Sequence, residues 1–151
     1  MKSKKVIQIV WWLYICLLFV IVVVKFNGSF EELENRIIMF SSEETINFNL
    51  IPFRSIGVQL THINEWWALK NILGNIISFI PFGFLLPIVY NKINSFFKFF
   101  ASNILFILFV ESFQFFTRIG CFDVDDIILN FVGSLCGYLV LLLVKFLFKR
   151  H

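Results

Sequence analysis

The chain has 151 residues, of which 59% are hydrophobic and only 15% charged, and its formal net charge is +3. Soluble domains carry roughly 45–50% apolar and about 25% charged residues. A soluble domain of this length cannot bury so much apolar surface in one core. The charges lie in short clusters between long apolar runs, without the basic face of a nucleic-acid-binding protein. Composition therefore excludes a soluble domain and indicates a single membrane domain over 1–151.

The first apolar run, Val6–Val24, follows three lysines and contains no charged residue. It is long enough to cross a bilayer, which takes about 20 apolar residues. A signal peptide would have a shorter apolar core that ends at a small-residue cleavage site. Neither feature is present, so we expect a retained helix over about 6–25. This helix should be a scaffold that contributes no polar group.

The segment 26–70 is the only long polar stretch, and six glutamates make it acidic. We expect a long loop here, with a short surface helix over 30–40. Extended chain should follow over 47–53, because Pro52 disfavours helix at the residue before it. Two tryptophans at 66 and 67 precede the next apolar run. Aromatic belts of membrane proteins occupy this position at the membrane–water boundary.

Three further membrane helices are expected over about 71–90, 99–117 and 126–148. Most of the basic residues lie in the two chain ends and in the short connection 91–98. The positive-inside rule therefore predicts cytoplasmic termini and places 26–70 and 118–125 outside. The predicted fold class is an all-α membrane protein, a four-transmembrane-helix bundle with a long extracytoplasmic loop between helices 1 and 2.

Polar residues recur at helical spacing in the last three predicted spans. Such residues are costly in a membrane and mark candidate functional sites, and steps of three or four place them on one face. At about 1.5 Å rise per residue, the three faces reach the outer half of the bilayer at similar depth. We therefore expect a polar chamber that opens outward and is closed below by apolar packing. The candidate binding residues are Asn71, Asn75, Glu111, Gln114, Arg118, Asp123, Asp125, Asp126 and Asn130. The same faces carry Gly74, Ser78, Asn103, Gly133 and Gly137.

Several of these residues also fit structural roles. Gln114, Asn75 and Asn130 are suited to interhelical hydrogen bonds, which contribute about 0.6 kcal/mol each. Glu111 would have to stretch to reach Arg118, two turns further along the same helix. A partner on another helix, or protonation, is the better explanation of its burial.

The acidic cluster at 123–126 has two explanations. Asp125 or Asp126 is placed to cap the last helix, and acidic residues suit the positive end of a helix dipole. Three carboxylates exceed what one cap needs. Together with Glu111 they are an alternative oxygen-ligand set for a hard cation, although the spacing is not that of a known calcium loop.

Gly133 and Gly137 form a small-xxx-small pattern that lets two helices approach closely. Packing within the bundle is the first interpretation, and self-association is the second. The three cysteines have neither a disulfide framework nor metal-ligand spacing, and the two histidines stand alone. We therefore assign no catalytic residue, no metal site and no cofactor.

An ordered series of short motifs resembles the VanZ-like family. The series comprises Asn49-Leu50-Ile51-Pro52-Phe53, Asn71-Ile-Leu-Gly74-Asn75, Phe79-Ile-Pro81-Phe-Gly83, Glu111-Ser-Phe-Gln114, Arg118, Asp123-Val-Asp125-Asp126, Asn130, Gly133 and Gly137. The resemblance covers about 47–142, which is most of the chain. It implies a multi-pass protein of the bacterial plasma membrane. The namesake of the family accompanies glycopeptide-resistance genes and raises resistance to teicoplanin, a phenotype that does not specify a mechanism.

The leading functional hypothesis is a non-enzymatic accessory or binding protein in the lipid bilayer that contributes to teicoplanin-type resistance. Its polar chamber would engage a lipid headgroup, a lipid-linked cell-wall precursor or a lipoglycopeptide, and no nucleic acid. The alternative is a membrane enzyme that uses carboxylates, with or without a bound cation, on a lipid-linked wall substrate. No nucleophile–base pair supports it. A transporter ranks third, because the sequence shows neither an internal repeat nor a polar path through the inner half.

Overall fold

The computed structural model describes residues 2–23, 30–41 and 48–148 of the chain. Within these residues four helices are long and apolar enough to cross a membrane, as predicted. The first comprises α1 and its π-helical continuation η1, and the others are α4, α5 and α6. Their bounds are Lys2–Leu18 for α1, Phe19–Val23 for η1, Trp66–Val89 for α4, Phe96–Phe116 for α5 and Val124–Phe148 for α6.

The helices begin earlier than the apolar runs indicate. α4 starts at Trp66 rather than near 71, so the two tryptophans form its first turn instead of preceding it. α5 starts at Phe96 rather than near 99, because the Ser95 hydroxyl accepts a hydrogen bond from the Lys98 N–H at 3.4 Å and caps the helix. Hydropathy marks the part of a helix that lies in lipid, whereas at α5 a capping residue decides where the helix begins.

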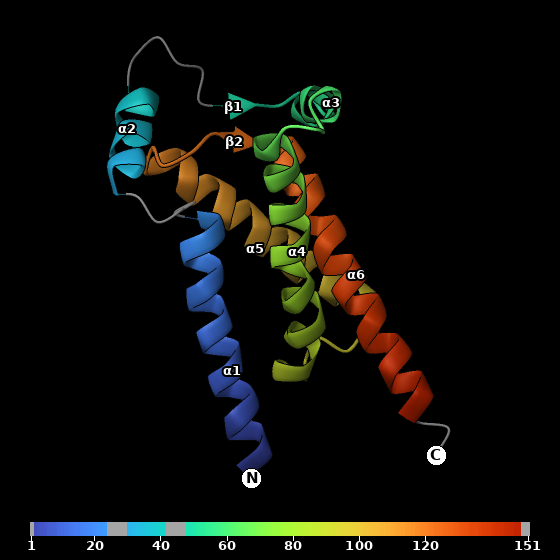
Figure 1. Ribbon diagram of the computed structural model, residues 1–151. Coiled ribbons are helices and arrows are strands. Elements are labelled where there is room, and N and C mark those ends of the chain that lie inside the picture. Colours follow the sequence, from blue (N-terminus) through green and yellow to red (C-terminus); the bar gives the residue numbers. More distant parts are fainter. Residues whose placement is uncertain (1, 24–29, 42–47, 149–151) are drawn as a thin grey trace.

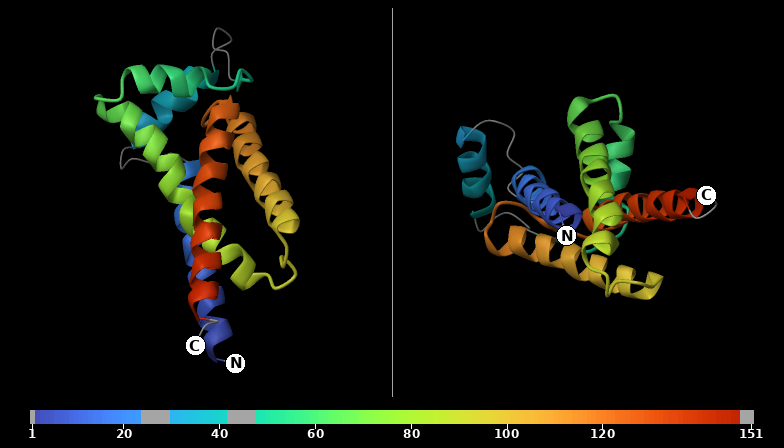
Figure 2. Two further views of the ribbon diagram at one scale, coloured as in Figure 1. Left: turned by 90° about the vertical axis from the view of Figure 1, so that its right-hand side faces the viewer. Right: turned by 90° about the horizontal axis from the view of Figure 1, so that it is seen from below.

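The bundle has two different ends. The first residues of α1 and the last residues of α6 lie at the same end of the bundle (Figure 1). At the opposite end, which we call the polar end, lie α2 (Phe30–Ser41), α3 (Arg54–Thr61) and the strands β1 (Phe48–Asn49) and β2 (Phe122–Asp123). Figure 2 shows α3 lying across the bundle, at a steep angle to α6.

The long loop expected between the first two spans is not confirmed. The surface helix expected over 30–40 is present as α2. Part of the expected extended chain forms β1, which pairs in parallel with β2 so that Asn49 lies opposite Asp123. The helix α3, which we did not expect, follows β1. Residues 24–29 and 42–47 lie outside the described residues. The backbone of Phe48 and Asn49 thus pairs with β2, directly before α6.

Helices α4 and α6 pack backbone against backbone. A Cβ atom added to Gly133 would lie 2.0 Å from the carbonyl oxygen of Ile76, and one added to Gly137 would lie 1.9 Å from that of Ile80. Gly83 on α4 meets the α6 backbone in the same way. Small residues permit this close approach. The two α6 glycines therefore act within the bundle, which was our first interpretation of their spacing.

The first helix packs on α4 and α5 through apolar and polar contacts. Trp11 is buried, and its ring lies 5.5 Å from that of Phe82. The Tyr14 hydroxyl donates a hydrogen bond to the backbone carbonyl of Ser78 at 2.7 Å. The carbonyl of Val22 accepts a hydrogen bond from Gln114 Nε2 at 2.8 Å. The prediction that this helix contributes no polar group is therefore wrong, because its hydroxyl and a carbonyl of its last turn satisfy groups on neighbouring helices.

Candidate functional site

Most of the predicted site residues are buried at the polar end, where α4 and α6 begin and α5 ends. Asp123 and Asn71 are half-buried, and no hydrogen bond of the Asn71 side chain is found among the described residues. Arg118 is exposed. The buried members of the set are Asn75, Glu111, Gln114, Asp125, Asp126 and Asn130. Burial in a membrane helix requires these groups to find protein partners.

Asp125 caps a helix to which it does not belong. Its Oδ1 accepts a hydrogen bond from the N–H of Phe53 at 2.5 Å, and its Oδ2 accepts from those of Ser55 at 2.7 Å and Ile56 at 3.0 Å. These are the N-terminal donors of α3, which have no partner within that helix. The carboxylate is 0% exposed. A negative charge at this position also complements the dipole of α3.

Asp123 caps α6 and links three segments. Its Oδ1 accepts from the N–H of Asp125 in the first turn of α6 at 2.9 Å, and also from Asn49 Nδ2 at 3.0 Å. Its Oδ2 accepts from the Ser55 hydroxyl at 2.5 Å. We expected Asp125 or Asp126 to cap this helix. The cap lies two or three residues earlier, because α6 begins at Val124 and Asp123 is the residue that precedes the helix.

The other two carboxylates at this end also face protein donors. Asp126 Oδ1 accepts a hydrogen bond from Asn75 Nδ2 at 2.8 Å, which joins α6 to α4. Glu111 Oε2 lies 3.4 Å from the N–H of Asp123 and accepts from it. This partner of Glu111 therefore lies in β2, whereas we expected a partner on another helix or protonation.

Arg118 terminates α5 with a positive φ of 56°. Its N–H donates to the carbonyl of Phe115 at 3.2 Å, and the N–H of Ile119 donates to that of Gln114 at 3.2 Å. This pair of bonds is a Schellman motif, which most often has glycine at the position of Arg118. The guanidinium donates to the carbonyl of Ser41 at the end of α2 at 3.0 Å. The structure therefore directs this side chain to α2 and away from the acidic cluster.

Three buried polar side chains further along α5 and α6 make no hydrogen bond among the described residues. They are Asn103, Asn130 and Ser134, and each is 0% exposed. Leaving such groups without partners costs about 1–3 kcal/mol each. Of these three, only Asn130 was among the candidate binding residues.

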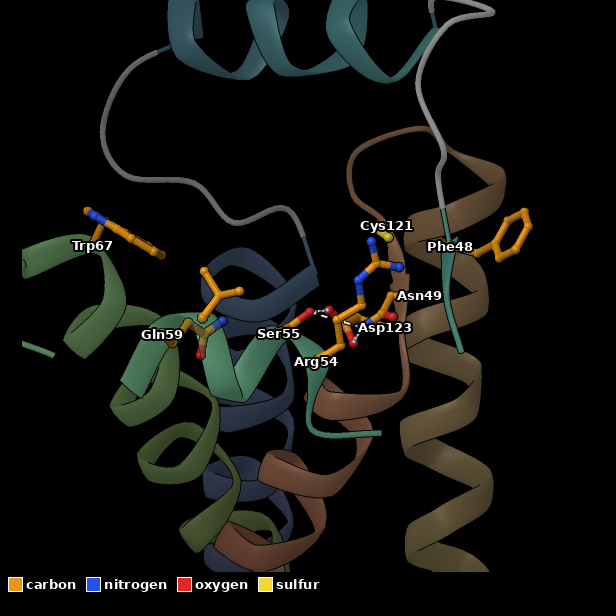
Figure 3. Close-up of a pocket in the computed structure, with 9 residues that line it drawn as sticks. Phe48, Asn49, Arg54, Ser55, Gln59, Trp67, Cys121 and Asp123 are labelled. Atoms are coloured by element: carbon orange, nitrogen blue, oxygen red, sulfur yellow. Dashed lines mark hydrogen bonds between the residues drawn. The ribbon is translucent and has the colours of Figure 1, made fainter. Parts of the chain in front are cut away.

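The polar end contains a cavity of about 400 Å³ beside the acidic cluster. Helix α3 forms one wall, and β1, the turn before β2 and the first turn of α4 form the others (Figure 3). Asp123 is the only predicted binding residue in its wall. The lining residues are Phe48, Asn49, Arg54, Ser55, Val58, Gln59, Trp67, Cys121 and Asp123.

The geometry gives no support to a cation bound by the acidic cluster. Among the described residues, no three His, Cys, Asp or Glu side chains converge as metal ligands would. The oxygens of Asp123 and Asp125 instead accept hydrogen bonds from amides and a hydroxyl. The close spacing of carboxylates in the sequence reflects two helix caps and one interhelical bond.

Sequence reasoning missed the two side chains that donate hydrogen bonds to Asp123, namely Asn49 and Ser55. Asn49 donates to both Asp123 and Ser55, and Ser55 donates to Asp123. Asn49 lies in one of the motifs that resemble the VanZ-like family, which was a usable signal. Ser55 had no such signal, because nothing in its local sequence shows that α3 begins beside it.

Comparison with known proteins shows the family of the chain. A family profile described as VanZ/LLP1 matches residues 11–145 of the chain. Protein VanZ from Enterococcus faecium is 34% identical over 91 residues, which cover 60% of this chain and 50% of that protein. The chain thus spans about half the length of this curated relative. No solved structure matches the chain. With its four apolar helices, the chain is a multi-pass membrane protein that belongs to the VanZ/LLP1 family.

Proposed function

We propose that this chain is a non-enzymatic accessory protein of the bacterial plasma membrane that contributes to teicoplanin-type resistance. In this proposal the polar end of the bundle binds the polar part of an amphipathic ligand. The candidate ligands are a lipid headgroup, a lipid-linked cell-wall precursor and a lipoglycopeptide. The family membership and the similarity to Protein VanZ support the link to resistance.

The observation that supports a binding role is that protein donors already occupy the oxygens of Asp123 and Asp125. A general acid or base must lie within hydrogen-bonding reach of its substrate. Asp125 is 0% exposed, and three backbone N–H groups occupy its oxygens. Asp123 likewise accepts bonds from protein donors on both oxygens. These groups hold the walls of the cavity in place, and the cavity is the part of the site that is left for a ligand.

The proposal places the polar end outside and both termini in the cytoplasm. The short connection between α4 and α5 contains Lys92 and begins at the opposite end of the bundle, where Lys4 and Lys5 also lie. Cytoplasmic loops carry an excess of such residues. A C-terminal alkaline phosphatase fusion should therefore be inactive, and a C-terminal green fluorescent protein fusion should be bright. The reverse pattern would invert the orientation.

Expression in a teicoplanin-susceptible Gram-positive host tests the proposed function. The wild type should raise the minimal inhibitory concentration of teicoplanin above that of the empty vector. Asp123→Asn, in the cavity wall at the polar end, should lose this effect at a normal membrane level, and Lys92→Gln, at the opposite end, should retain it. No increase from the wild type, at a membrane level verified by immunoblot, would reject the proposal.

A further inference from the structure

The cavity at the polar end is lined by a buried amide, Gln59, whose oxygen accepts no hydrogen bond from a described residue. Gln59 on α3 is only 7% exposed, and its Oε1 is enclosed without a hydrogen bond among the described residues. An enclosed polar group without a partner lowers stability. Rotation about the last side-chain torsion exchanges the amide oxygen and the NH₂ group, so Gln59 can offer either an acceptor or a donor to the cavity. No described residue bonds to the amide oxygen of Gln59, whereas a ligand in the cavity would provide a hydrogen-bond partner for this amide.

The same cavity contains a cation, Arg54, that forms no ion pair with any described residue. Arg54 begins α3, is exposed, and makes no ion pair within the described part of the chain. Figure 3 shows its side chain extending past Asp123 toward Cys121. No ion pair joins it to Asp123 among the described residues, since that carboxylate accepts hydrogen bonds from Asn49, Ser55 and the N–H of Asp125. A guanidinium pairs well with phosphate, to which it can donate two parallel hydrogen bonds.

Apolar side chains surround this polar wall. Val58 on α3 is 52% exposed and Trp67 in the first turn of α4 is 48% exposed, and both line the cavity. Trp67 belongs to a helix that is apolar enough to cross the membrane, and tryptophan in the first turn of such a helix is typical of the headgroup region. The ligand should therefore be amphipathic, with an anionic head in the cavity and an apolar part in the bilayer.

We propose that the cavity binds the phosphate headgroup of an anionic membrane lipid, with Arg54 contacting the phosphate oxygens. Gln59 bonds to a phosphate oxygen or a headgroup hydroxyl, and Trp67 packs on the apolar part next to the headgroup. This inference rests on the proposed function, because it names the ligand class of the same site. Neither Arg54, Gln59 nor Trp67 was among the residues that sequence spacing indicated.

Lipid titration of the purified full chain tests this inference. The protein in detergent is titrated with phosphatidylglycerol or with phosphatidylcholine, which has a phosphate but neither a net charge nor a hydroxyl donor. Bound lipids are counted by native mass spectrometry. The wild type should bind phosphatidylglycerol more tightly than phosphatidylcholine. Arg54→Gln should weaken that binding about tenfold, the effect of losing one charge-assisted hydrogen bond. Lys70→Gln, which removes an exposed cation at the same end outside the cavity wall, should leave it unchanged.

Gln59→Leu separates recognition from folding. Replacing an enclosed, unpartnered amide by an apolar group of similar size should keep or raise the thermal stability, while the affinity for phosphatidylglycerol falls. Unchanged affinity in this variant would overturn the inference. Equal binding of the two lipids, or equal losses from Lys70→Gln and Arg54→Gln, would overturn it as well. If soluble sn-glycerol 3-phosphate binds as tightly as the lipid, the membrane is not the source of the ligand.

The two proposals fail in different experiments. If the wild type raises teicoplanin resistance but shows no preference for phosphatidylglycerol, the lipid site is wrong and the proposed function stands. If the lipid binds through Arg54 and Gln59 but expression leaves resistance unchanged, the site is right and the resistance role is wrong.

Discussion

The carboxylate of Asp125, at the start of α6, accepts a hydrogen bond from the N–H of Ser55 in the first turn of α3 at 2.7 Å. The two residues are 70 positions apart. Because the carboxylate also accepts from Phe53 and Ile56, α3 depends on α6 for the cap that its own sequence lacks. The wall of the cavity is therefore positioned by the acidic cluster, and that is the structural role of the cluster.

Removing the Asp125 carboxylate should release α3 while leaving the spans intact. Each hydrogen bond to a charged group contributes about 1.5–3 kcal/mol. Asp125→Ala should therefore give fast amide hydrogen exchange in 53–61 and early proteolysis there, with α4 and α6 still protected. Hydrogen exchange read by mass spectrometry measures this directly. Glu65→Ala, which removes only an exposed bond to Trp67, is the matched control. Uniform loss of protection across all helices would show that Asp125 holds the whole bundle.

The sequence predicted the membrane-spanning helices well and the polar end of the bundle poorly, because the helices depend on local sequence and the polar end depends on nonlocal contacts. Long apolar runs are a local property, so four helices could be placed from hydropathy alone. The role of Asp125 is nonlocal, because its partners on α3 are close to it only in the folded chain. Helical spacing likewise placed Asn75 and Asp126 on inward faces, and the structure joins them. No spacing rule could show that Arg54 and Gln59 would line a cavity beside them.

The backbone contact between α4 and α6 should make Gly133 intolerant of any side chain. Gly133→Ala would place a Cβ 2.0 Å from the Ile76 carbonyl oxygen, and rigid backbone cannot yield as a side chain would. Overpacking typically costs about 1–3 kcal/mol and more where backbones touch. The free energy of unfolding in SDS titrations, together with the membrane level, should fall accordingly.

Gly74 supplies the control for that experiment. It also lies on α4, but a Cβ added there meets nothing within 4 Å. Gly74→Ala should be neutral or stabilising by up to about 1 kcal/mol, because alanine favours helix over glycine. Equal losses from Gly74→Ala and Gly133→Ala would contradict the proposed backbone contact and would suggest a general intolerance of the bundle.

Helix α1 should be held to the bundle partly by one hydroxyl. Tyr14→Phe removes the bond to the Ser78 carbonyl and little else. The expected loss in the free energy of unfolding is about 0.6 kcal/mol and at most about 2 kcal/mol, as for other interhelical bonds in membranes. Tyr138→Phe is the control, because that ring stacks on Phe99 at 4.2 Å and its hydroxyl makes no bond among the described residues. Equal effects from both changes would mean that the ring environment, and not the Ser78 bond, is responsible.

In the turn after α5, glycine should be at least as favourable for stability at position 118 as the native arginine. Arg118 has a φ of 56°, a conformation that disfavours a residue with a Cβ by about 1–2 kcal/mol and glycine hardly at all. Arg118→Gly relieves this strain and loses only an exposed bond to the Ser41 carbonyl. Its free energy of unfolding should stay equal to that of the wild type or rise by about 1 kcal/mol. Arg118→Val, with its branched Cβ, should be clearly less stable than either. If glycine instead lowers stability as much as valine does, the contact with α2 outweighs the backbone strain, and the guanidinium is what fixes this turn.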